Sequence, residues 1–396
     1  IDVPVVIRNR ELTYRPPLMY RRCYYGANRH HPAFAAKLRN NAVADDEKIG
    51  GRTPWRLINH SVSRWVSVRK FGDEHPEYFA LVDGKRRAWM DNDHFADGGT
   101  QPCMTHPDVK RLITEGVLEY LEKHPERINI SVSQNDNRMY CRCDECAAID
   151  KREGTHMGAL LALVNEVADA VAEQHPGVQV GTLAYQYSRK PPKHMKPRDN
   201  VAIQLCSIEC CVMHPIDDPA CEQNRAFCDD LAGWGRISDQ VHVWNYNTNF
   251  RDYFCPVPNL RVIGPNVKYF AANNARGLFM QAAGGGKSTE LQDLRNYVIS
   301  RLMWDPTLDG QELIDEFIAL HYGEAAGLIR RYVALIHDNA AERGIHRHCF
   351  GAPADYGIDA GIVERGTKLI EQAMAAAESG AVRRRVEKAS LTMRRM

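Results

Sequence analysis

Residues 128–146 read INISVSQNDNRMYCRCDEC, and this stretch carries the pattern on which the fold depends. Isoleucine and valine alternate with polar residues over 128–133, which predicts a β-strand. The strand runs directly into Gln-Asn-Asp-Asn at 134–137, and three cysteines in a C-x-C-x2-C spacing follow. Polar side chains at the carboxyl end of a strand, with a helix after them, are typical of sites in α/β proteins.

The same unit of strand, polar loop and helix recurs along the chain. In addition to 128–133, we predict strands over 18–25, 58–65, 101–105, 178–187, 201–207, 241–246 and 277–281. Eight strands, each followed by a helix or a long loop, predict a (β/α)8 TIM barrel rather than an open doubly wound sheet.

After Pro306 the pattern becomes purely helical, with predicted helices over 310–322, 324–342 and 359–379. We therefore predict a barrel over residues 1–306 and a C-terminal α-helical extension over 307–396. We expect the extension to be truncated, because the helical pattern runs to the last residue.

Composition and charge argue against several classes of partner. The chain of 396 residues has 51 Lys and Arg, 50 Asp and Glu and a formal net charge of +1, with no basic run. Nucleic acid and an anionic membrane are therefore not expected as main partners. No apolar run approaches the roughly 18 to 20 residues that span a bilayer, and no signal-peptide pattern opens the chain.

The carboxyl ends of the predicted strands hold the residues from which a sugar site is built. Amides bond ring hydroxyls, aromatic faces stack on the sugar's C–H face, and a carboxyl pair cleaves the glycosidic bond. The candidate substrate-binding residues are His60, Gln101, Asn135, Tyr185, Tyr187, Trp244, Asn245, Tyr246 and Gln281.

Asp136 and Glu209 are the candidate catalytic carboxylates. Asp136 is a general acid or base, or alternatively it caps a turn beside Asn135 and Asn137. Glu209 has mostly apolar or thiol neighbours in the sequence, an environment that raises a carboxyl pKa and suits acid–base catalysis. The alternative for Glu209 is a buried glutamate paired with an arginine.

The cysteines of the opening stretch form a candidate metal site. Cys141, Cys143 and Cys146 supply three thiolates for one structural Zn²⁺. The fourth ligand remains open between Cys210, Cys211 and His156. The alternatives are a disulfide between two of the three cysteines, or free thiols that pack a loop.

Further motifs complete the pattern: HPEYF (75–79), DGK (83–85), QPC (101–103), SQND (133–136), AYQY (184–187), WNY (244–246) and LMWDP (302–306). From about residue 20 to 336 the chain resembles a bacterial glycosidase-like family first catalogued as domain of unknown function 4838. That family is similar to α-glucuronidases and hexosaminidases with (β/α)8 barrels. It underlies glycoside hydrolase family 163, with endo-β-N-acetylglucosaminidase activity on complex N-glycans.

The resemblance implies a hydrolase whose partner is an oligosaccharide or glycoprotein glycan, with a periplasmic or extracellular location and no cofactor required for catalysis. One of Asp136 and Glu209 would protonate the glycosidic oxygen. The other would activate water or orient the 2-acetamido group of the substrate. Tyr187 would bond the acetamido oxygen, and Trp244 would stack on the ring.

One residue departs from the family pattern, because Asn245 stands where Asp is expected in the W-x-Y motif. Two other functions also stay open. An α-glucuronidase-like hydrolase would need Arg64 or Arg295 in the pocket to pair with a uronate. A glycan-binding protein without turnover would fit Asn245 and cysteines that serve only as a structural clamp.

Overall fold

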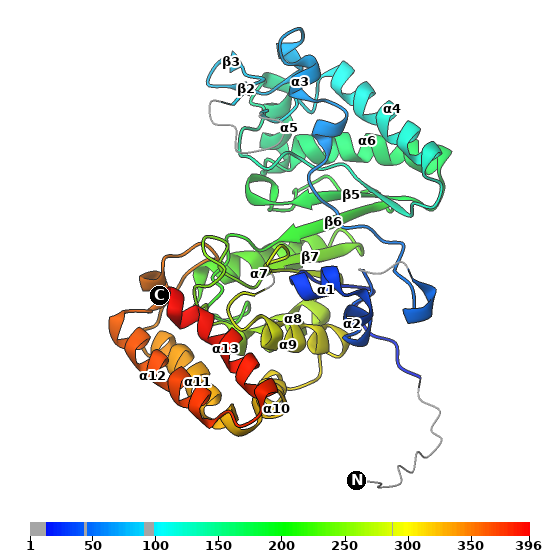
Figure 1. Cartoon of the computed structure of the whole chain (residues 1–396). Helices are drawn as coiled ribbons and strands as arrows, with labels where there is room; N and C mark the ends of the chain where they lie inside the picture. Colours follow the sequence, from blue (N-terminus) through cyan, green and yellow to red (C-terminus); the bar gives the residue numbers. More distant parts are fainter. Residues whose placement is uncertain (1–12, 43–45, 91–98, 287) are drawn as a thin grey trace.

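The computed structural model describes residues 13–42, 46–90, 99–286 and 288–396. Within these ranges six parallel strands form one sheet that curls into a half-barrel (Figure 1). In pairing order they are β1 (Tyr20–Cys23), β8 (Ala275–Gln281), β7 (Val241–Tyr246), β6 (Val201–Cys206), β5 (Gln179–Ala184) and β4 (Asn129–Ser131). A separate antiparallel hairpin joins β2 (Leu81–Val82) to β3 (Lys85–Arg86).

Helices follow the strands, and in Figure 1 α4 to α6 lie on one side of the sheet and α8 to α13 on the other. The α-helices are α1 (Gly26–His30), α2 (Pro32–Lys37), α3 (Val68–Phe71), α4 (Pro107–Lys123), α5 (Asp144–Glu153), α6 (Gly158–Gln174), α7 (Glu222–Gly235), α8 (Leu260–Ala272), α9 (Gln292–Trp304), α10 (Gly310–Tyr322), α11 (Ala326–Glu342), α12 (Ala360–Ala376) and α13 (Gly380–Arg395). The 3-10 helices are η1 (Glu47–Ile49), η2 (Val62–Arg64), η3 (Pro76–Tyr78), η4 (Gln186–Ser188), η5 (Gly323–Ala325) and η6 (Pro353–Tyr356).

The central strands of the sheet are buried on both faces. Every residue of β6, with the sequence VAIQLC, is buried, and so are the last five residues of β5. Continuous apolar runs of this kind are typical of parallel strands covered on both sides. Helix α6 covers β5 and β6 with a row of buried side chains that includes Leu160, Val164 and Val171.

The prediction of a complete eight-stranded barrel is only partly confirmed. Six predicted strands form the sheet, but the predicted strands at 58–65 and 101–105 do not join it. Residues 99–102 instead make two isolated antiparallel bridges with residues that precede them. Pro102 pairs with Phe79, and Gly99 pairs with Trp89. The sheet is therefore open between β4 and β1.

The segment predicted as the second strand lies against the sheet without extending its ladder. The side chains of Asn129 and Ser131 bond the backbone of Arg56 and Asn59, where a strand would use backbone groups. Ile58 packs where β5 has Gly181, and a Cβ on that glycine would lie 2.4 Å from Ile58 Cγ1. Apolar side chains hold the segment in place, so its alternating sequence looks like that of a strand.

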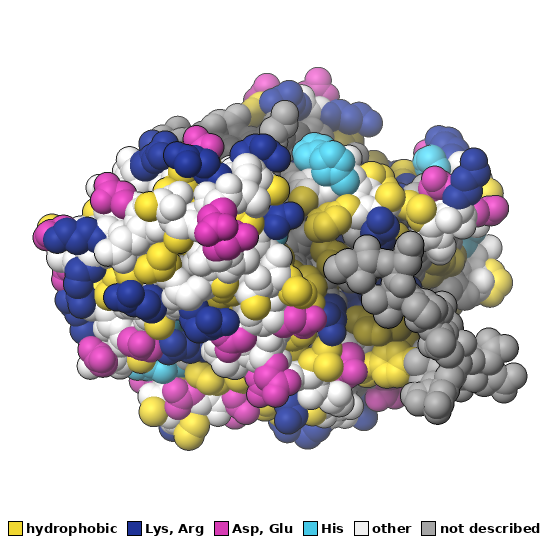
Figure 2. All heavy atoms as spheres, turned by 60° about the horizontal axis from the view of Figure 1, so that its bottom comes forward, with side chains coloured by type: hydrophobic (Ala, Val, Ile, Leu, Met, Phe, Trp, Pro, Cys, Tyr) yellow, Lys and Arg dark blue, Asp and Glu magenta, His cyan; other side chains and the backbone are white. Residues whose placement is uncertain are grey.

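Helices α10 to α13 pack on one another, and α10 also packs on α8 and α9. The helical character predicted for the C-terminal region agrees with these elements, while the domain boundary at residue 306 stays a prediction. On the face shown in Figure 2, charged side chains of both signs are mixed. Among the described helices, none combines the length and hydrophobicity needed to cross a bilayer.

Candidate active site

A cavity of about 790 Å³ opens at the carboxyl ends of β4 to β8. The carboxyl ends of parallel strands meet at one edge of a sheet, so side chains far apart in sequence converge there. The wall includes residues from the loops after β4, β5 and β6 and from β7 and β8. Predicted site residues in this wall are His60, Asp136, Tyr185, Trp244, Tyr246 and Gln281.

Asp136 is held at this cavity by the loop that follows β4. Gln101 is buried, and its amide oxygen accepts the backbone N–H of Asn135 at 2.8 Å. The amide nitrogen of Gln101 donates to the carbonyls of Asn135 (2.8 Å) and Asn137 (3.0 Å). Gln101 and Asn135 therefore lie behind the cavity wall, where they fix the loop instead of lining the cavity.

The carboxylate of Asp136 has two neighbours. The hydroxyl of Tyr185 donates to Oδ1 at 2.9 Å, and Nε2 of His60 lies 3.6 Å from the same oxygen. His60 Nδ1 lies 2.6 Å from the carbonyl of Gln134 and must donate to it, because a carbonyl only accepts. A second proton on this ring would therefore sit on Nε2, where it faces Asp136.

Tyr185 is nearly buried and acts as a fixed donor. Burial, and then the charge of Asp136, raise the pKa of Tyr185 above its usual value, so the phenol keeps its proton. Gln186 donates to the Tyr185 hydroxyl at 2.9 Å and has a φ of 51°, which is unusual for a residue with a side chain. Such backbone strain persists where surrounding contacts hold it.

The prediction that Glu209 lies in an apolar environment is wrong. Glu209 follows β6, and its carboxylate pairs with Arg138 at 2.9 Å and with Arg189 at 3.3 Å. Its side chain is 35% exposed and is not part of the cavity wall. The arginine-paired alternative describes it better, although the pair is half-exposed instead of buried. Sequence neighbours failed as a guide because both arginines come from segments far away in the sequence.

The far wall of the cavity is aromatic. Trp244 and Tyr246 alternate along β7, and the indole N–H of Trp244 donates to the side chain of Gln281. Asn245 lies between them, buried, and accepts the Ser207 hydroxyl at 2.8 Å. The residue that departs from the family pattern is therefore outside the cavity wall.

Tyr187 lies apart from the other predicted site residues. It lines a different cavity of about 590 Å³ and packs against Tyr140, with ring centroids 4.9 Å apart. The hydroxyl of Tyr140 lies 2.9 Å from His156 Nε2, and the Nδ1 of that ring lies 3.0 Å from Asp150. The 3-10 turn η4 begins directly after Tyr185, and the two tyrosine side chains therefore line different cavities.

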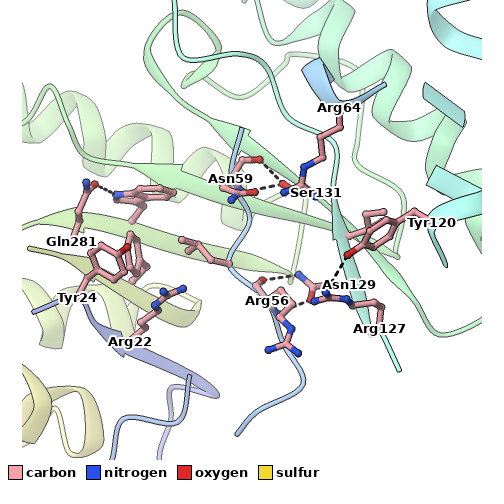
Figure 3. A pocket seen from close by; sticks show the side chains of 14 residues that line it. Arg22, Tyr24, Arg56, Asn59, Arg64, Tyr120, Arg127, Asn129, Ser131 and Gln281 are labelled. Atoms are coloured by element: carbon pink, nitrogen blue, oxygen red, sulfur yellow. Dashed lines mark hydrogen bonds between the residues drawn. The ribbon is translucent and has the colours of Figure 1, made fainter. Parts of the chain in front are cut away.

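A third cavity, of about 470 Å³, adjoins the candidate site and shares Trp244 and Gln281 with it (Figure 3). Figure 3 shows arginines reaching it from β1, from residues 56–64 and from the loop before β4. These are Arg22, Arg56, Arg64 and Arg127. Arg295, the other arginine considered for a uronate, is fully buried and bonded to Glu290. Sequence reasoning found only Arg64 of this group.

Four cysteines meet beside the loop that carries Asp136. The Sγ atoms of Cys103, Cys141, Cys143 and Cys146 lie within 4.8 Å of one another. Cys103 Sγ lies 3.6 Å from Cys143 Sγ and 3.9 Å from Cys146 Sγ. A Zn–S distance of about 2.3 Å gives a tetrahedron with edges of about 3.8 Å. The group fits a metal ion, and each of these cysteines is a free thiol.

The fourth member of this group is Cys103. The prediction from sequence, which considered Cys210, Cys211 and His156 as the fourth ligand, is therefore wrong. Cys103 was missed because its signal is not local in the sequence. It lies on the segment that was predicted as a strand, two residues after Gln101.

Comparison with known proteins gives the family. The model of a family described as a domain of unknown function, DUF4838, matches residues 3–334. The chain belongs to this family. The resemblance drawn from the motifs is confirmed, while membership of glycoside hydrolase family 163 stays a prediction. No curated protein matches this DUF4838 member.

Two solved structures are similar to this DUF4838 chain. One is described as a GH138 enzyme targeting pectin rhamnogalacturonan II, with 12% identity, a TM-score of 0.43, and 73% of this chain and 41% of that one covered. The other is CpGH84B, with 9% identity, a TM-score of 0.44, and coverage of 95% and 66%. The chain spans 41% of the length of the first and about two thirds of the length of the second.

Proposed function

We propose that the protein is a glycoside hydrolase in which Asp136 is the catalytic acid and base. The observation that carries the proposal is the surroundings of Asp136. Among the described residues of the cavity wall it is the one carboxylate, and the wall also offers an imidazole, a phenol, an amide and an indole. This is the mixture that binds ring hydroxyls and stacks on a sugar face.

The number of carboxylates favours a particular route. Direct retaining and inverting mechanisms use two carboxyl groups that flank the bond. Glu209 pairs with Arg138 and Arg189 outside the wall, so Asp136 is left as the single candidate acid there. A sugar with a 2-acetamido group supplies its own nucleophile, so this route needs no second carboxylate to attack the sugar. We therefore propose cleavage beside an N-acetylglucosamine, as the family resemblance to N-glycan endo-hydrolases implies.

Each neighbour then has a role. Tyr185 holds Oδ1 of Asp136, which leaves Oδ2 to give a proton to the glycosidic oxygen and later to take one from water. Trp244 stacks on the sugar. Glu209 acts from the rim as a positioning residue, since it fixes the Arg138 guanidinium, which also donates to Gln186 at 3.1 Å.

The test is release of glycan from a biantennary N-glycopeptide. Asp136→Asn should lower kcat/KM by about 10²- to 10⁴-fold, the usual contribution of a general acid. The exposed Asp199→Asn serves as the matched control and should not change the rate. A glycan with a 2-hydroxyl in place of the acetamido group should not be cleaved. Full activity of Asp136→Asn contradicts the site, and glycan binding without release favours the binding-protein alternative.

A second candidate substrate is an oligosaccharide that carries a uronate. The arginine-lined cavity beside Trp244 favours it, because guanidinium groups pair bidentately with carboxylates. The Nε atom of Arg22 is buried and has no hydrogen-bond partner in the described structure. If this cavity is the subsite, an aldouronic acid is hydrolysed and Arg22→Gln raises its KM. If only the neutral N-glycan is cleaved, the candidate falls.

For the four-cysteine group we propose a structural zinc ion, with no part in the reaction because all four positions are filled by protein. The purified protein should contain zinc that Cys103→Ser removes. Cys228→Ser is the control, since Cys228 is a free thiol outside this group. Zinc content that is unchanged in Cys103→Ser would contradict this assignment.

A further inference from the structure

A second group of potential metal ligands lies away from the four cysteines. Cys211 and His214 are in the loop between β6 and α7, and Cys221 is the N-cap residue of α7. His346 comes from the loop between α11 and η6. One ligand atom from each of these four residues lies within 4.8 Å of the other three. Two thiols and two imidazoles from distant segments therefore meet at one point.

The sulfur–nitrogen distance between Cys211 and His214 is close to that of a tetrahedral site. Cys211 Sγ lies 3.4 Å from His214 Nδ1. The rings of His214 and His346 are nearly parallel, with centroids 3.9 Å apart. Zn–S bonds of about 2.3 Å and Zn–N bonds of about 2.0–2.1 Å give a tetrahedron with sulfur–nitrogen edges of about 3.5 Å. A simple thiol–imidazole hydrogen bond explains only one of these contacts.

The surrounding loop is built to hold the ligands in place. The backbone N–H of Cys211 donates to the side chain of Asn224 at 2.9 Å, and Asn224 in turn donates to the carbonyl of His214 at 3.2 Å. Met213 N–H points at Cys211 Sγ, 3.4 Å away. Bonds of this kind orient metal ligands and stabilise a thiolate. Cys211 and Cys221 are both buried, and both are free thiols.

We propose that Cys211, His214, Cys221 and His346 bind a second structural Zn²⁺, which ties the loop after α11 to the loop after β6. The proposal does not rest on the glycosidase assignment. Beside the ligands, Val212 N–H donates to the carbonyl of Arg347 at 2.9 Å, so the two loops already meet.

The position of this site gives the ion a consequence for the candidate active site. Ile208, three residues before Cys211, and Phe350, four residues after His346, both line its cavity. Phe350 also packs on Phe250, with ring centroids 5.7 Å apart. A metal at the Cys2His2 group would hold this part of the wall against β6 and β7.

The test is the zinc content of the full chain, measured by mass spectrometry of the metal. With both groups filled, the protein should hold two zinc ions per chain, and His346→Ala and Cys221→Ser should each remove one. His346 is exposed, so its replacement should leave the fold intact, which circular dichroism checks. His348→Ala in the same loop and Cys228→Ser are the matched controls and should keep both ions.

A Cys103→Ser background separates the two metal sites. In that variant one zinc should remain, and Co²⁺ put in its place should give the charge-transfer absorption of two thiolates, which His346→Ala abolishes. Zinc content that does not fall in His346→Ala or in Cys221→Ser overturns the proposal. So does a Cys211–Cys221 disulfide in protein purified with its free thiols trapped.

Discussion

At the scale of single residues, the hydroxyl of Tyr185 fixes the carboxylate of Asp136. Tyr185 and His60 both approach Oδ1 of Asp136, and the Gln134 carbonyl fixes which nitrogen of His60 carries its proton. Oδ2 is thereby left for a ligand. The same tyrosine is protonated because burial and the carboxylate oppose a second negative charge.

Removing the hydroxyl of Tyr185 tests this arrangement. Tyr185→Phe deletes the 2.9 Å bond to Asp136 and leaves the ring in place. A hydrogen bond to a charged group contributes about 1.5–3 kcal/mol, so kcat/KM for the glycopeptide should fall about 10- to 100-fold.

Tyr187→Phe is the matched control, because Tyr187 lies two residues away and lines another cavity. Its kcat/KM should equal that of the unmodified protein. Equal losses in both variants would show that the effect is structural, and no loss in Tyr185→Phe would remove Tyr185 from the site.

At the scale of elements, one short segment clamps the loop after β4 at both ends. The side chain of Gln101 accepts the backbone N–H of Asn135 at the start of that loop. Cys103 Sγ contacts Cys143 Sγ at its end. Residues 101–103 were predicted as part of the third strand, but their polar atoms serve the loop instead of a ladder. The segment therefore positions Asp136 without belonging to the sheet.

Gln101→Ala should destabilise this loop. The substitution leaves the partly buried Asn135 N–H and the carbonyls of Asn135 and Asn137 without their partner. A polar group left unsatisfied when fully buried costs about 1–3 kcal/mol, which sets the upper bound of the effect. We expect a lower melting temperature and a lower kcat/KM, measured by calorimetry and by glycan release. Gln174→Ala, at the exposed end of α6, should change neither. A Gln101→Ala variant with normal stability and activity would contradict the clamp.

At the scale of the whole molecule, the core contains several buried phenols. Burial raises the pKa of Tyr25, Tyr246 and Tyr332 above the usual value. In the unfolded chain these groups ionise at about pH 10, whereas the native state keeps their protons. Their contribution to stability is therefore complete below about pH 10 and is lost as the pH rises further.

Urea unfolding at about pH 8 and at about pH 10.5, on either side of the ordinary tyrosine pKa, measures this effect. The midpoint should be lower at the higher pH. Tyr25→Phe, which removes a buried hydroxyl without a hydrogen-bond partner in the described structure, should show a smaller shift. Equal midpoints at both pH values for the unmodified protein would mean that these phenols do not govern alkaline unfolding.

Strands such as β6 and β7 were predictable because they are continuous apolar or alternating runs bounded by turns. Residues 58–65 mimic a strand, since Ile58 and Val62 are buried, yet the backbone of Asn59 bonds the side chain of Ser131 instead of a neighbouring strand. The periodicity and hydrophobicity of a segment indicate that it is buried. They do not indicate which partner accepts or donates its backbone hydrogen bonds.

The sequence by itself determined the family, the alternation of strand and helix, and the position of Asp136 after a buried strand, because these depend on local pattern and spacing. Only the tertiary structure decided which distant side chains meet. It brought Cys103 to Cys141–Cys146 and His346 to Cys211, and it turned Glu209 to two arginines and Tyr187 to another cavity. The direction in which a loop aims a side chain depends on contacts between remote segments, and no local pattern records those contacts.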